Sequence, residues 1–390
     1  MKVALCYENV LPARGGCETY ITDLARRLTT DGHEVHVFAS RWDASALPAT
    51  ILFHRLPVFH GPRFLRPWRF AAACARALAE FPDLVSLGFD KTWGQDVLYP
   101  QGGLHAASAD HNLLKYSNLG VRTVVRAMKA LDPAHRSFLR LEKQQYLHGN
   151  ALIVAISEMV ARHFQYYYGL PSERIRLVRC AVDPDRFDER DRPRRRHEWR
   201  ERFGIRPEET VGLFMAMNYR LKGIEPLLYT VRLLPSDRPF RLLVVGHPKT
   251  SRWQTLAADL EINHRVCFAG FCDDAKDAYF ASDFLIHPTF YDPCSLVVLE
   301  ALTCGLPVIT SAYNGASELL EPPREGYVVT DPHDHEQLAW CIEQLLDPSR
   351  RTRCAQAARR TAAAWTFDHH YQQLLQVLKE ANNRRASLAG

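Results

Sequence analysis

The residues best suited to carry chemistry lie between positions 287 and 307. The pattern predicts a strand that ends near His287 and a helix from Ser295 to Cys304, with Gly305 as the residue that closes the helix. Glu300 would then lie on an otherwise apolar face of this helix, where a carboxylate without a hydrogen-bond partner is costly. A ribose diol would satisfy such a carboxylate, as it does in dinucleotide sites.

The loop before this helix is suited to binding an anion. Exposed backbone amides and the positive end of the helix would hold a diphosphate, with Asp292 close to the sugar that the diphosphate carries. The loop residues expected to contribute are Pro293, Cys294, Ser295 and Leu296. The alternative is that Asp292 only caps the helix and that Glu300 pairs with a nearby arginine.

Short β-branched runs, which we interpret as strands, alternate with longer amphipathic stretches along the whole chain. Most of the runs are continuously apolar, which is typical of parallel strands buried on both faces. The alternation predicts βαβ units and therefore an α/β protein with doubly wound sheets. The predicted strands are Val3–Tyr7, Glu34–Phe38, Leu84–Leu87, Ala151–Ile156, Val211–Ala216, Arg241–Val245, Val266–Ala269, Phe284–Ile286, Val308–Thr310 and Tyr327–Thr330.

A chain of 390 residues is long enough for two domains. We expect a Rossmann-like domain over residues 1–185, a basic linker over 186–207, a second Rossmann-like domain over 208–366 and a C-terminal helix over 367–390 that crosses back to the first domain. Parallel sheets bind ligands at the carboxyl ends of their strands. Two such domains facing each other across a cleft would suit a reaction that joins two molecules while excluding water.

The net charge of +5 is unevenly distributed. Residues 1–180 hold 22 basic and 15 acidic residues, whereas residues 181–390 hold 27 basic and 29 acidic residues. Seven basic and two acidic residues, interleaved with apolar ones, lie within 111–145 alone. Basic amphipathic helices suit an anionic membrane surface or a phosphorylated, lipid-linked acceptor. The alternatives are a solvated helix packed on its own domain, or nucleic-acid binding, which no recognised motif supports.

Composition excludes several classes of protein. With 47% hydrophobic and 24% charged residues, the chain is not disordered. The ten cysteines show no paired or zinc-like spacing, so we expect a reduced, cytoplasmic protein without a bound metal. The N-terminus lacks a signal-peptide pattern, and no apolar run approaches the ~20 residues of a membrane span. We therefore expect any membrane contact to be peripheral.

Five segments in chain order resemble the signatures of one enzyme family. The pair Asp292 and Glu300, followed by Gly305-Leu306-Pro307, resembles the donor motif of the retaining glycosyltransferases of family GT4. The other four segments are Gly15-Gly16-Cys17-Glu18 with the helix after it and Gly32-His33-Glu34-Val35, the stretch from Ala155 to Phe187, Arg220-Leu221-Lys222-Gly223, and Asn314-Gly315-Ala316-Ser317-Glu318. The resemblance spans about residues 1–385 and implies the GT-B fold, in which two Rossmann-like domains face each other across a cleft.

The resemblance implies roles for the charged residues of the second half. Arg220 and Lys222 would hold the donor diphosphate, because departing UDP carries negative charge while the sugar becomes cation-like. Glu300 would bind the ribose, and Asp292 with its loop would hold the sugar. The alternative for Lys222 is a solvated loop residue.

Three residues of the first half are implicated in the same way. His105, after a Gly-Gly turn, would reach the donor sugar, bind a hydroxyl and polarise the site without acting as a nucleophile. Gly15 and Gly16 would bring the backbone close to the donor phosphates, where side chains would clash. Otherwise His105 is a solvated histidine and the glycine pair an ordinary turn.

The segment from His287 to Glu300 is most similar to the lipopolysaccharide core glucosyltransferases. We therefore expect transfer of a hexose, glucose from UDP-glucose, onto a sugar hydroxyl of a lipid-linked saccharide. Asp292 stands where the family usually has Glu, Ser295 where many members have Gly, and Ala181 where Gly is usual, which leaves the sugar open. The family requires no bound metal, and we interpret the DxD-like Asp183-Pro184-Asp185 as a structural turn.

Other functions remain compatible with the same residues. One is a GT4 transferase with a different donor or acceptor. Another is a sugar-nucleotide epimerase, which would need carboxylates for proton abstraction and no basic acceptor face. A third is a non-enzymatic scaffold for membrane or nucleic acid, for which intact Asp292, Glu300 and Lys222 would be unnecessary. Because no second carboxylate is placed as a nucleophile, we expect the leaving phosphate to accept the proton of the incoming hydroxyl.

Overall fold

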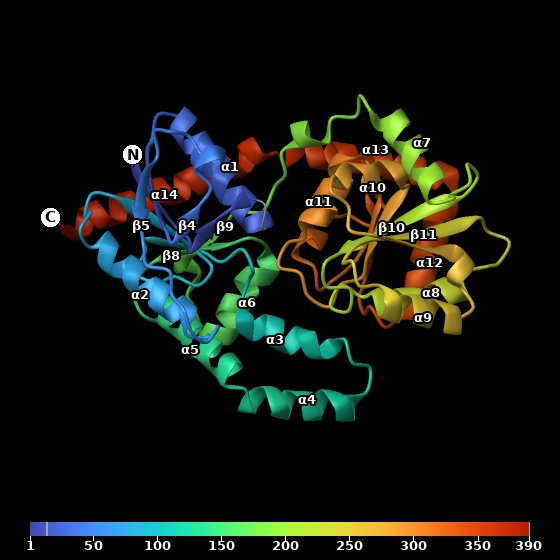
Figure 1. Cartoon of the computed structure of the whole chain (residues 1–390), viewed down its shortest axis with the longest axis horizontal. Coiled ribbons are helices and arrows are strands. Elements are labelled where there is room, and N and C mark those ends of the chain that lie inside the picture. Colours follow the sequence, from blue (N-terminus) through green and yellow to red (C-terminus); the bar gives the residue numbers. More distant parts are fainter. Residues whose placement is uncertain (13–14, 390) are drawn as a thin grey trace. The chain divides into compact units, whose positions relative to one another are not determined.

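The computed structural model describes residues 1–12 and 15–389. They form two compact units. Unit 1 comprises Met1–Asp110, Gly120–Arg179 and Tyr371–Gly390, and unit 2 comprises His111–Leu119 and Cys180–His370. The C-terminal segment therefore belongs to the unit in which the chain begins (Figure 1).

Unit 1 is built on a parallel sheet in which the described part of the chain has seven strands, in the order β5-β3-β1-β6-β7-β8-β9. The strands are β1 (Lys2–Cys6), β3 (Glu34–Ala39), β5 (Leu52–Arg55), β6 (Val85–Phe89), β7 (Val97–Tyr99), β8 (Leu152–Ala155) and β9 (Ile175–Leu177). A short separate pair is formed by β2 (Asn9–Val10) and β4 (Arg41–Trp42). The strand order reverses between β1 and β6, which is where open α/β sheets bind ligands.

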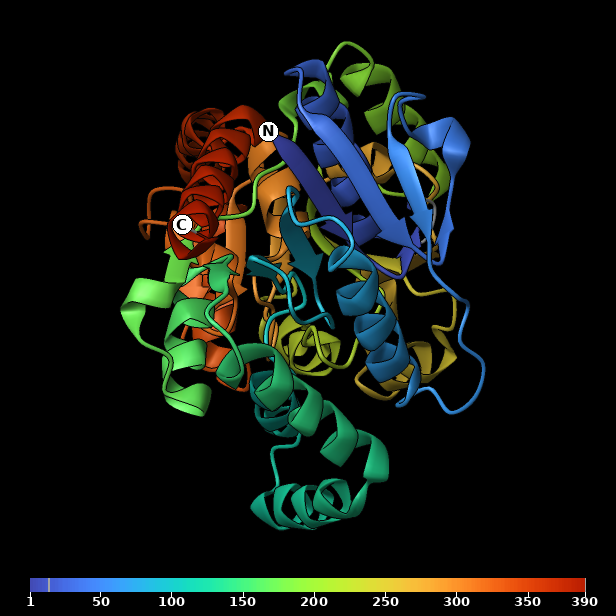
Figure 2. The ribbon, with the colours of Figure 1, turned by 90° about the vertical axis from the view of Figure 1, so that its left-hand side faces the viewer.

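The helices of this part of the chain are α1 (Gly16–Thr30), α2 (Arg66–Leu78), α3 (His105–Leu114), α4 (Leu119–Leu131), α5 (Pro133–Leu147), α6 (Glu158–Tyr168) and α14 (Phe367–Ala389). Helix α1 buries Ile21, Leu24 and Leu28, which recur at helical spacing on one face. Helix α4 differs, because none of its residues is buried and it stands away from the sheet of unit 1 (Figures 1 and 2).

Unit 2 is built on a second parallel sheet, which has six strands among the described residues, in the order β12-β11-β10-β13-β14-β15. The strands are β10 (Thr210–Ala216), β11 (Phe240–Gly246), β12 (Val266–Gly270), β13 (Phe284–His287), β14 (Val308–Ser311) and β15 (Gly326–Val329). The order reverses between β10 and β13. This doubly wound order confirms the predicted α/β class.

Helices cover both faces of this second sheet (Figure 1). One core layer joins the sheet to α8 (Ile224–Leu233), α9 (Ser251–Asp259) and α12 (His335–Leu346). The other joins it to α7 (Arg192–Arg202), α10 (Ala275–Ala281) and α11 (Leu296–Thr303). Helix α13 (Pro348–Ala364) contributes to both layers. Burial on both faces explains why the strands of this unit are so uniformly apolar.

All ten predicted strands are present, with ends that differ by one or two residues. The predictions missed the two-residue strands β2 and β4, and also β5, β7 and β9. Strand β7 has only three residues, while β5 and β9 lie at the sheet edges and are partly exposed, so none has a long apolar run.

The segment 186–207 is not a linker in the structure. Its arginines pair with carboxylates of unit 2, so that α7 packs against that unit. Arg195 lies 3.0 Å from Asp274 and 2.5 Å from Asp277, and Arg200 lies 2.8 Å from Asp283. The basic composition that suggested an interdomain linker therefore reflects ion pairing within unit 2.

Candidate functional site

The loops after β10 and β13 contact each other at the strand-order reversal of unit 2. The backbone N–H of Phe290 donates to the carbonyl of Leu221 at 2.9 Å. Gly223 has φ +86°, and a Cβ atom there would lie 2.1 Å from the carbonyl oxygen of Pro288. Only glycine fits this approach, so Gly223 holds the loop of Lys222 against the loop of Asp292.

Lys222 and Asp292 form a direct ion pair. Lys222 Nζ donates to Asp292 Oδ2 at 2.6 Å and to the carbonyl of Tyr291 at 3.1 Å. The lysine and aspartate side chains are 20% and 14% exposed, so solvent screens the pair only weakly. Asp292 is therefore the counter-ion of Lys222, and its predicted alternative role as the cap of α11 is wrong.

His287 lies on the other side of this pair. Its Nε2 atom is 3.5 Å from Asp292 Oδ2. Burial raises the pKa of Asp292, but Lys222 and His287 lower it by more, so its pKa is below the usual range and the carboxylate is ionised. Burial and Lys222 lower the pKa of His287 despite the attraction of Asp292, which leaves the imidazole neutral.

The N-terminus of α11 lies next to the ion pair in sequence. Ser295 occupies the cap position, but its side chain makes no capping hydrogen bond. Its backbone N–H donates instead to Asn314 Oδ1 at 3.2 Å, and Asn314 Nδ2 donates to Thr310 Oγ1 at 3.0 Å. The backbone carbonyl of Ser295 accepts from the N–H of Val298 at 3.2 Å, but its hydroxyl accepts from no amide of the first turn. The predicted donor-binding residues at this end are Pro293 and Cys294, both half-buried, buried Ser295 and exposed Leu296.

Glu300 has a partner that the sequence did not indicate. Tyr279 of α10 donates its hydroxyl to Glu300 Oε2 at 2.6 Å. Burial raises the pKa of Glu300, although this hydrogen bond lowers it in part. The two residues lie 21 positions apart on different helices, so no local spacing could have identified the pair.

Arg220 lies in the same turn as Lys222 and makes different contacts. Its guanidinium lies 4.4 Å from the ring centroid of Tyr116, and its Nε atom lies 3.9 Å from a carboxylate oxygen of Glu225. Because a cation–π contact and a long ion pair hold Arg220 only loosely, its role toward a diphosphate stays a prediction.

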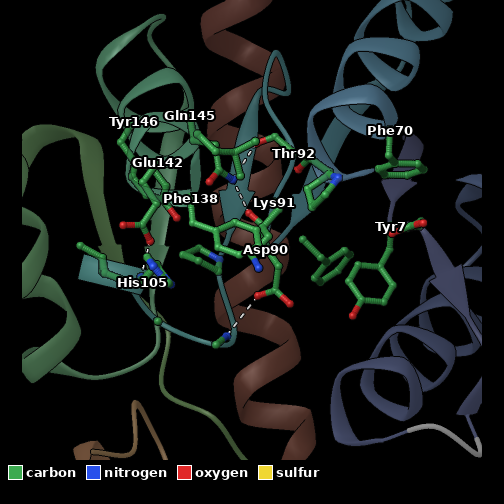
Figure 3. A pocket seen from close by; sticks show the side chains of 18 of the residues that line it. Tyr7, Phe70, Asp90, Lys91, Thr92, His105, Phe138, Glu142, Gln145 and Tyr146 are labelled. Atoms are coloured by element: carbon green, nitrogen blue, oxygen red, sulfur yellow. Dashed lines mark hydrogen bonds between the residues drawn. The ribbon is translucent and has the colours of Figure 1, made fainter. Parts of the chain in front are cut away.

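Unit 1 has a cavity of about 420 Å³ at its own strand-order reversal (Figure 3). Residues after β1 and β6 line it, together with residues of α2, α3 and α5. Asp90, directly after β6, has φ +49°, which is strained for a residue with a side chain, and it accepts a hydrogen bond from the backbone N–H of Gly102 at 3.1 Å. The walls combine aromatic rings such as Tyr7, Phe70 and Phe138 with carboxylates.

His105 begins α3 and lines this cavity (Figure 3). Its backbone N–H donates to Glu142, and its Nε2 atom lies 2.9 Å from Nδ1 of His135. Burial, together with His135 and Lys91, lowers the pKa of His105 to about 4. The side chain is therefore a neutral imidazole held by a second histidine, not a solvated turn residue.

The glycine pair lies at the start of α1. Gly15 precedes α1 with extended backbone (φ 167°), which any residue adopts, and Gly16 is the first helical residue. A Cβ atom on Gly15 would lie 3.3 Å from Glu18 Oε2. The predicted approach of this loop to donor phosphates stays a prediction.

Asp183 forms a turn, as predicted for the DxD-like segment. It accepts a hydrogen bond from the backbone N–H of Asp185 at 3.0 Å. Over residues 1–12 and 15–389, we found no group of three or more His, Cys, Asp or Glu side chains that could hold a metal. The same residues contain no helix that combines the length and the apolarity of a membrane span.

The two parts of the chain match two related families. Residues 14–186 match "Glycosyltransferase Family 4", and residues 195–361 match "Glycosyl transferases group 1". The chain is a glycosyltransferase. The predicted transferase activity is thereby confirmed, and the epimerase and scaffold alternatives lose their support.

Relatives of this glycosyltransferase are similar along almost its whole length. The lipopolysaccharide glucosyltransferase WaaG of Escherichia coli K12 is 25% identical over 352 residues, which are 90% of each chain. A crystal structure of WaaG, 24% identical, superposes with a TM-score of 0.76 over 96% of this chain and 98% of that one. Anabaena Alr3699/HepE in complex with UDP-glucose, 19% identical, gives 0.70 over 97% and 100%. The GT-B fold is therefore confirmed.

Proposed function

We propose that this glycosyltransferase transfers glucose from UDP-glucose, with retained anomeric configuration, onto a sugar hydroxyl of a lipid-linked saccharide such as lipopolysaccharide core. The observation that carries the proposal is the buried Lys222–Asp292 pair at the strand-order reversal, directly before α11 with Glu300. The name of the E. coli relative and the UDP-glucose complex of the Anabaena protein support the choice of donor and acceptor.

The donor would be held by groups that have unused hydrogen-bonding capacity. An ammonium has three N–H donors, and Lys222 uses two of them on Asp292 and Tyr291. The third, with the amides that begin α11, would bind the diphosphate. Tyr279 occupies one oxygen of Glu300, so the other oxygen would accept hydrogen bonds from the ribose hydroxyls.

The reaction would break the bond between the anomeric carbon and the diphosphate oxygen and form a bond from that carbon to the acceptor oxygen on the same face. The proton of the acceptor hydroxyl would pass to the leaving phosphate. Lys222 would stabilise the negative charge that develops on the diphosphate, while ionised Asp292 holds Lys222 in place and accepts a hydrogen bond from the sugar. We expect no metal in this scheme.

The acceptor sugar would bind in the cavity of unit 1. Aromatic rings beside carboxylates and amides, as on its walls, are suited to the apolar faces and hydroxyls of a sugar. Helix α4 would place the enzyme on the membrane that carries the acceptor. Its apolar side chains Val124, Met128 and Leu131 are 60%, 66% and 76% exposed, with Arg126 and Lys129 on the same short helix. Such a helix suits peripheral binding to anionic lipid.

A panel of nucleotide sugars, each scored by the shift that it causes in thermal unfolding, tests the donor. We expect the largest shift with UDP-glucose and transfer of labelled glucose to a lipid-linked saccharide. A larger thermal shift with another nucleotide sugar would identify that compound, and not UDP-glucose, as the donor. Transfer only to soluble acceptors would overturn the lipid-linked acceptor.

A further inference from the structure

Unit 2 has a second concavity, of about 630 Å³, at the opposite edge of its sheet from Lys222 and Asp292. Pro323 and Arg324, which line it, directly precede β15, whereas the donor loops follow β10 and β13. All strands of this sheet are parallel, so the amino end of β15 and the carboxyl ends of β10 and β13 lie at opposite edges. The concavity, which we call the arginine cavity, is therefore separate from the donor site.

Arginines dominate the lining of the arginine cavity. Helix α13 contributes Arg350, Arg353 and Arg360, which at spacings of three and seven residues lie on one face of the helix. Pro323, Arg324, Tyr327, Trp340, Cys354, Gln356 and Ala357 complete the lining, which contains no aspartate or glutamate.

The guanidinium groups of Arg350, Arg353 and Arg360 lack carboxylate partners among the described residues. Arg350 donates to the hydroxyl of Tyr327 at 3.5 Å, and neither Arg353 nor Arg360 forms an ion pair with any residue of 1–12 or 15–389. Arg195, Arg196 and Arg200 of α7 in the same unit are, by contrast, paired with carboxylates. Like charges three residues apart on a helix repel each other, so a bound anion would relieve the repulsion.

An aromatic surface lies beside these guanidinium groups. Trp340 of α12 is 52% exposed although it is a large apolar side chain, and its ring packs against that of Tyr327 with centroids 5.3 Å apart. Guanidinium groups recognise phosphate through paired hydrogen bonds, and an exposed indole offers a face for a ring. The volume falls in the range of small-molecule sites.

We propose that the arginine cavity binds a small phosphorylated ring compound, with the phosphate on Arg350, Arg353 and Arg360 and the ring against Trp340. The proposal concerns a site apart from the donor and does not depend on the proposed function. Sugar phosphates and nucleoside monophosphates share this chemistry.

Calorimetric titration of the full-length protein tests the proposal, with glucose 6-phosphate, UMP, inorganic phosphate and glucose as probes. We expect glucose 6-phosphate or UMP to bind and glucose not to bind. Affinity should fall at least tenfold in R353Q/R360Q and should be unchanged in R194Q/R202Q, which removes two exposed arginines from α7. W340A should weaken the binding of the ring compounds more than it weakens the binding of inorganic phosphate.

The variant K222A distinguishes binding at the donor site from binding at the arginine cavity. Binding that survives in K222A and is lost in R353Q/R360Q supports the proposal. Binding that is lost in K222A alone assigns the phosphate to the donor site and overturns it. The proposal is also overturned if the wild type and R353Q/R360Q bind the phosphorylated probes with equal affinity. It is overturned as well if no phosphorylated probe binds while anionic vesicles or RNA do.

Discussion

Lys222 Nζ and Asp292 Oδ2 lie 2.6 Å apart, although 70 positions of sequence separate the two residues. The backbone bond between Phe290 and Leu221 and the close approach at Gly223 hold their loops together. Each buried charge therefore depends on the other, and a donor phosphate would meet a lysine that is already oriented.

Replacement of Lys222 by alanine should lower kcat about 100- to 1000-fold, because it removes the group that stabilises the charge on the leaving diphosphate. Transfer from UDP-glucose under saturating donor measures the effect. Lys249→Ala, an exposed lysine in the loop after the neighbouring strand β11, is the matched control and should retain wild-type activity. A K222A enzyme as active as K249A would refute the assignment.

Removal of the glycine at 223 should separate the two loops. Gly223→Ala places a Cβ atom against the Pro288 carbonyl, so we expect a loss of about 2–4 kcal/mol in stability and of most of the donor binding. Gly204→Ala is the control, because Gly204 also has a positive φ (+61°) but nothing lies within 4 Å of its Cβ position. It should cost only about 1 kcal/mol, measured by denaturant unfolding. Equal costs would show that the close approach contributes nothing.

Glu300→Gln should raise KM for the donor about 10- to 100-fold with a smaller effect on kcat. A hydrogen bond to a charged acceptor contributes about 1.5–3 kcal/mol, and the ribose is remote from the reacting carbon. Tyr279→Phe should raise KM less, because it removes only the group that orients Glu300. Glu343→Gln, an exposed glutamate on α12, serves as the control. If E300Q lowers kcat and leaves KM unchanged, Glu300 does not bind the ribose.

The stability of unit 1 should depend on pH through His105. Its pKa of about 4 in the folded protein lies below the value of an unfolded histidine, so its contribution to stability is fully present above about pH 6.5 and is lost as the pH falls toward 4. When the pH is lowered from 7.5 to 4.5, the free energy of unfolding should fall in both proteins, and the fall should be smaller in His105→Gln by up to about 2 kcal/mol. Urea unfolding at the two pH values measures the difference. The control is His197→Gln, at an exposed site on α7, which should lose as much stability between the two pH values as the wild type. If H105Q also loses as much stability as the wild type, His105 is not held neutral in the folded protein.

Helix α4 should determine membrane binding. The double variant V124E/M128E places two carboxylates on the exposed apolar side chains and should weaken binding to anionic vesicles at least tenfold at low salt. Co-sedimentation measures the bound fraction. Tyr166→Glu changes an aromatic residue on α6 that is even more exposed, and this variant should bind as the wild type does. If V124E/M128E binds the vesicles as strongly as the wild type, the membrane contact lies elsewhere in the protein. If the wild type itself does not bind the vesicles, peripheral membrane binding is excluded.

The sequence by itself determined which segments form the core strands and that these strands lie in parallel sheets. Long apolar runs such as those of β10 and β11 are stable only when both faces are covered, and this constraint is visible in composition alone. Short or half-exposed strands such as β7 and β9 carry no such constraint and were missed. The sequence also placed Asp292 and Glu300 correctly before and on a helix, because helix entry and termination depend on nearby residues.

Only the tertiary structure decided which charges meet. Tyr279 contacts Glu300 across two helices, Lys222 contacts Asp292 across two loops, and the arginines of α7 meet carboxylates up to 87 positions away. Such pairs depend on how sheets and helices pack, which brings distant residues together without any periodic signal in the chain. The same packing covers the apolar face of α1 and leaves that of α4 exposed, although both helices are amphipathic in sequence.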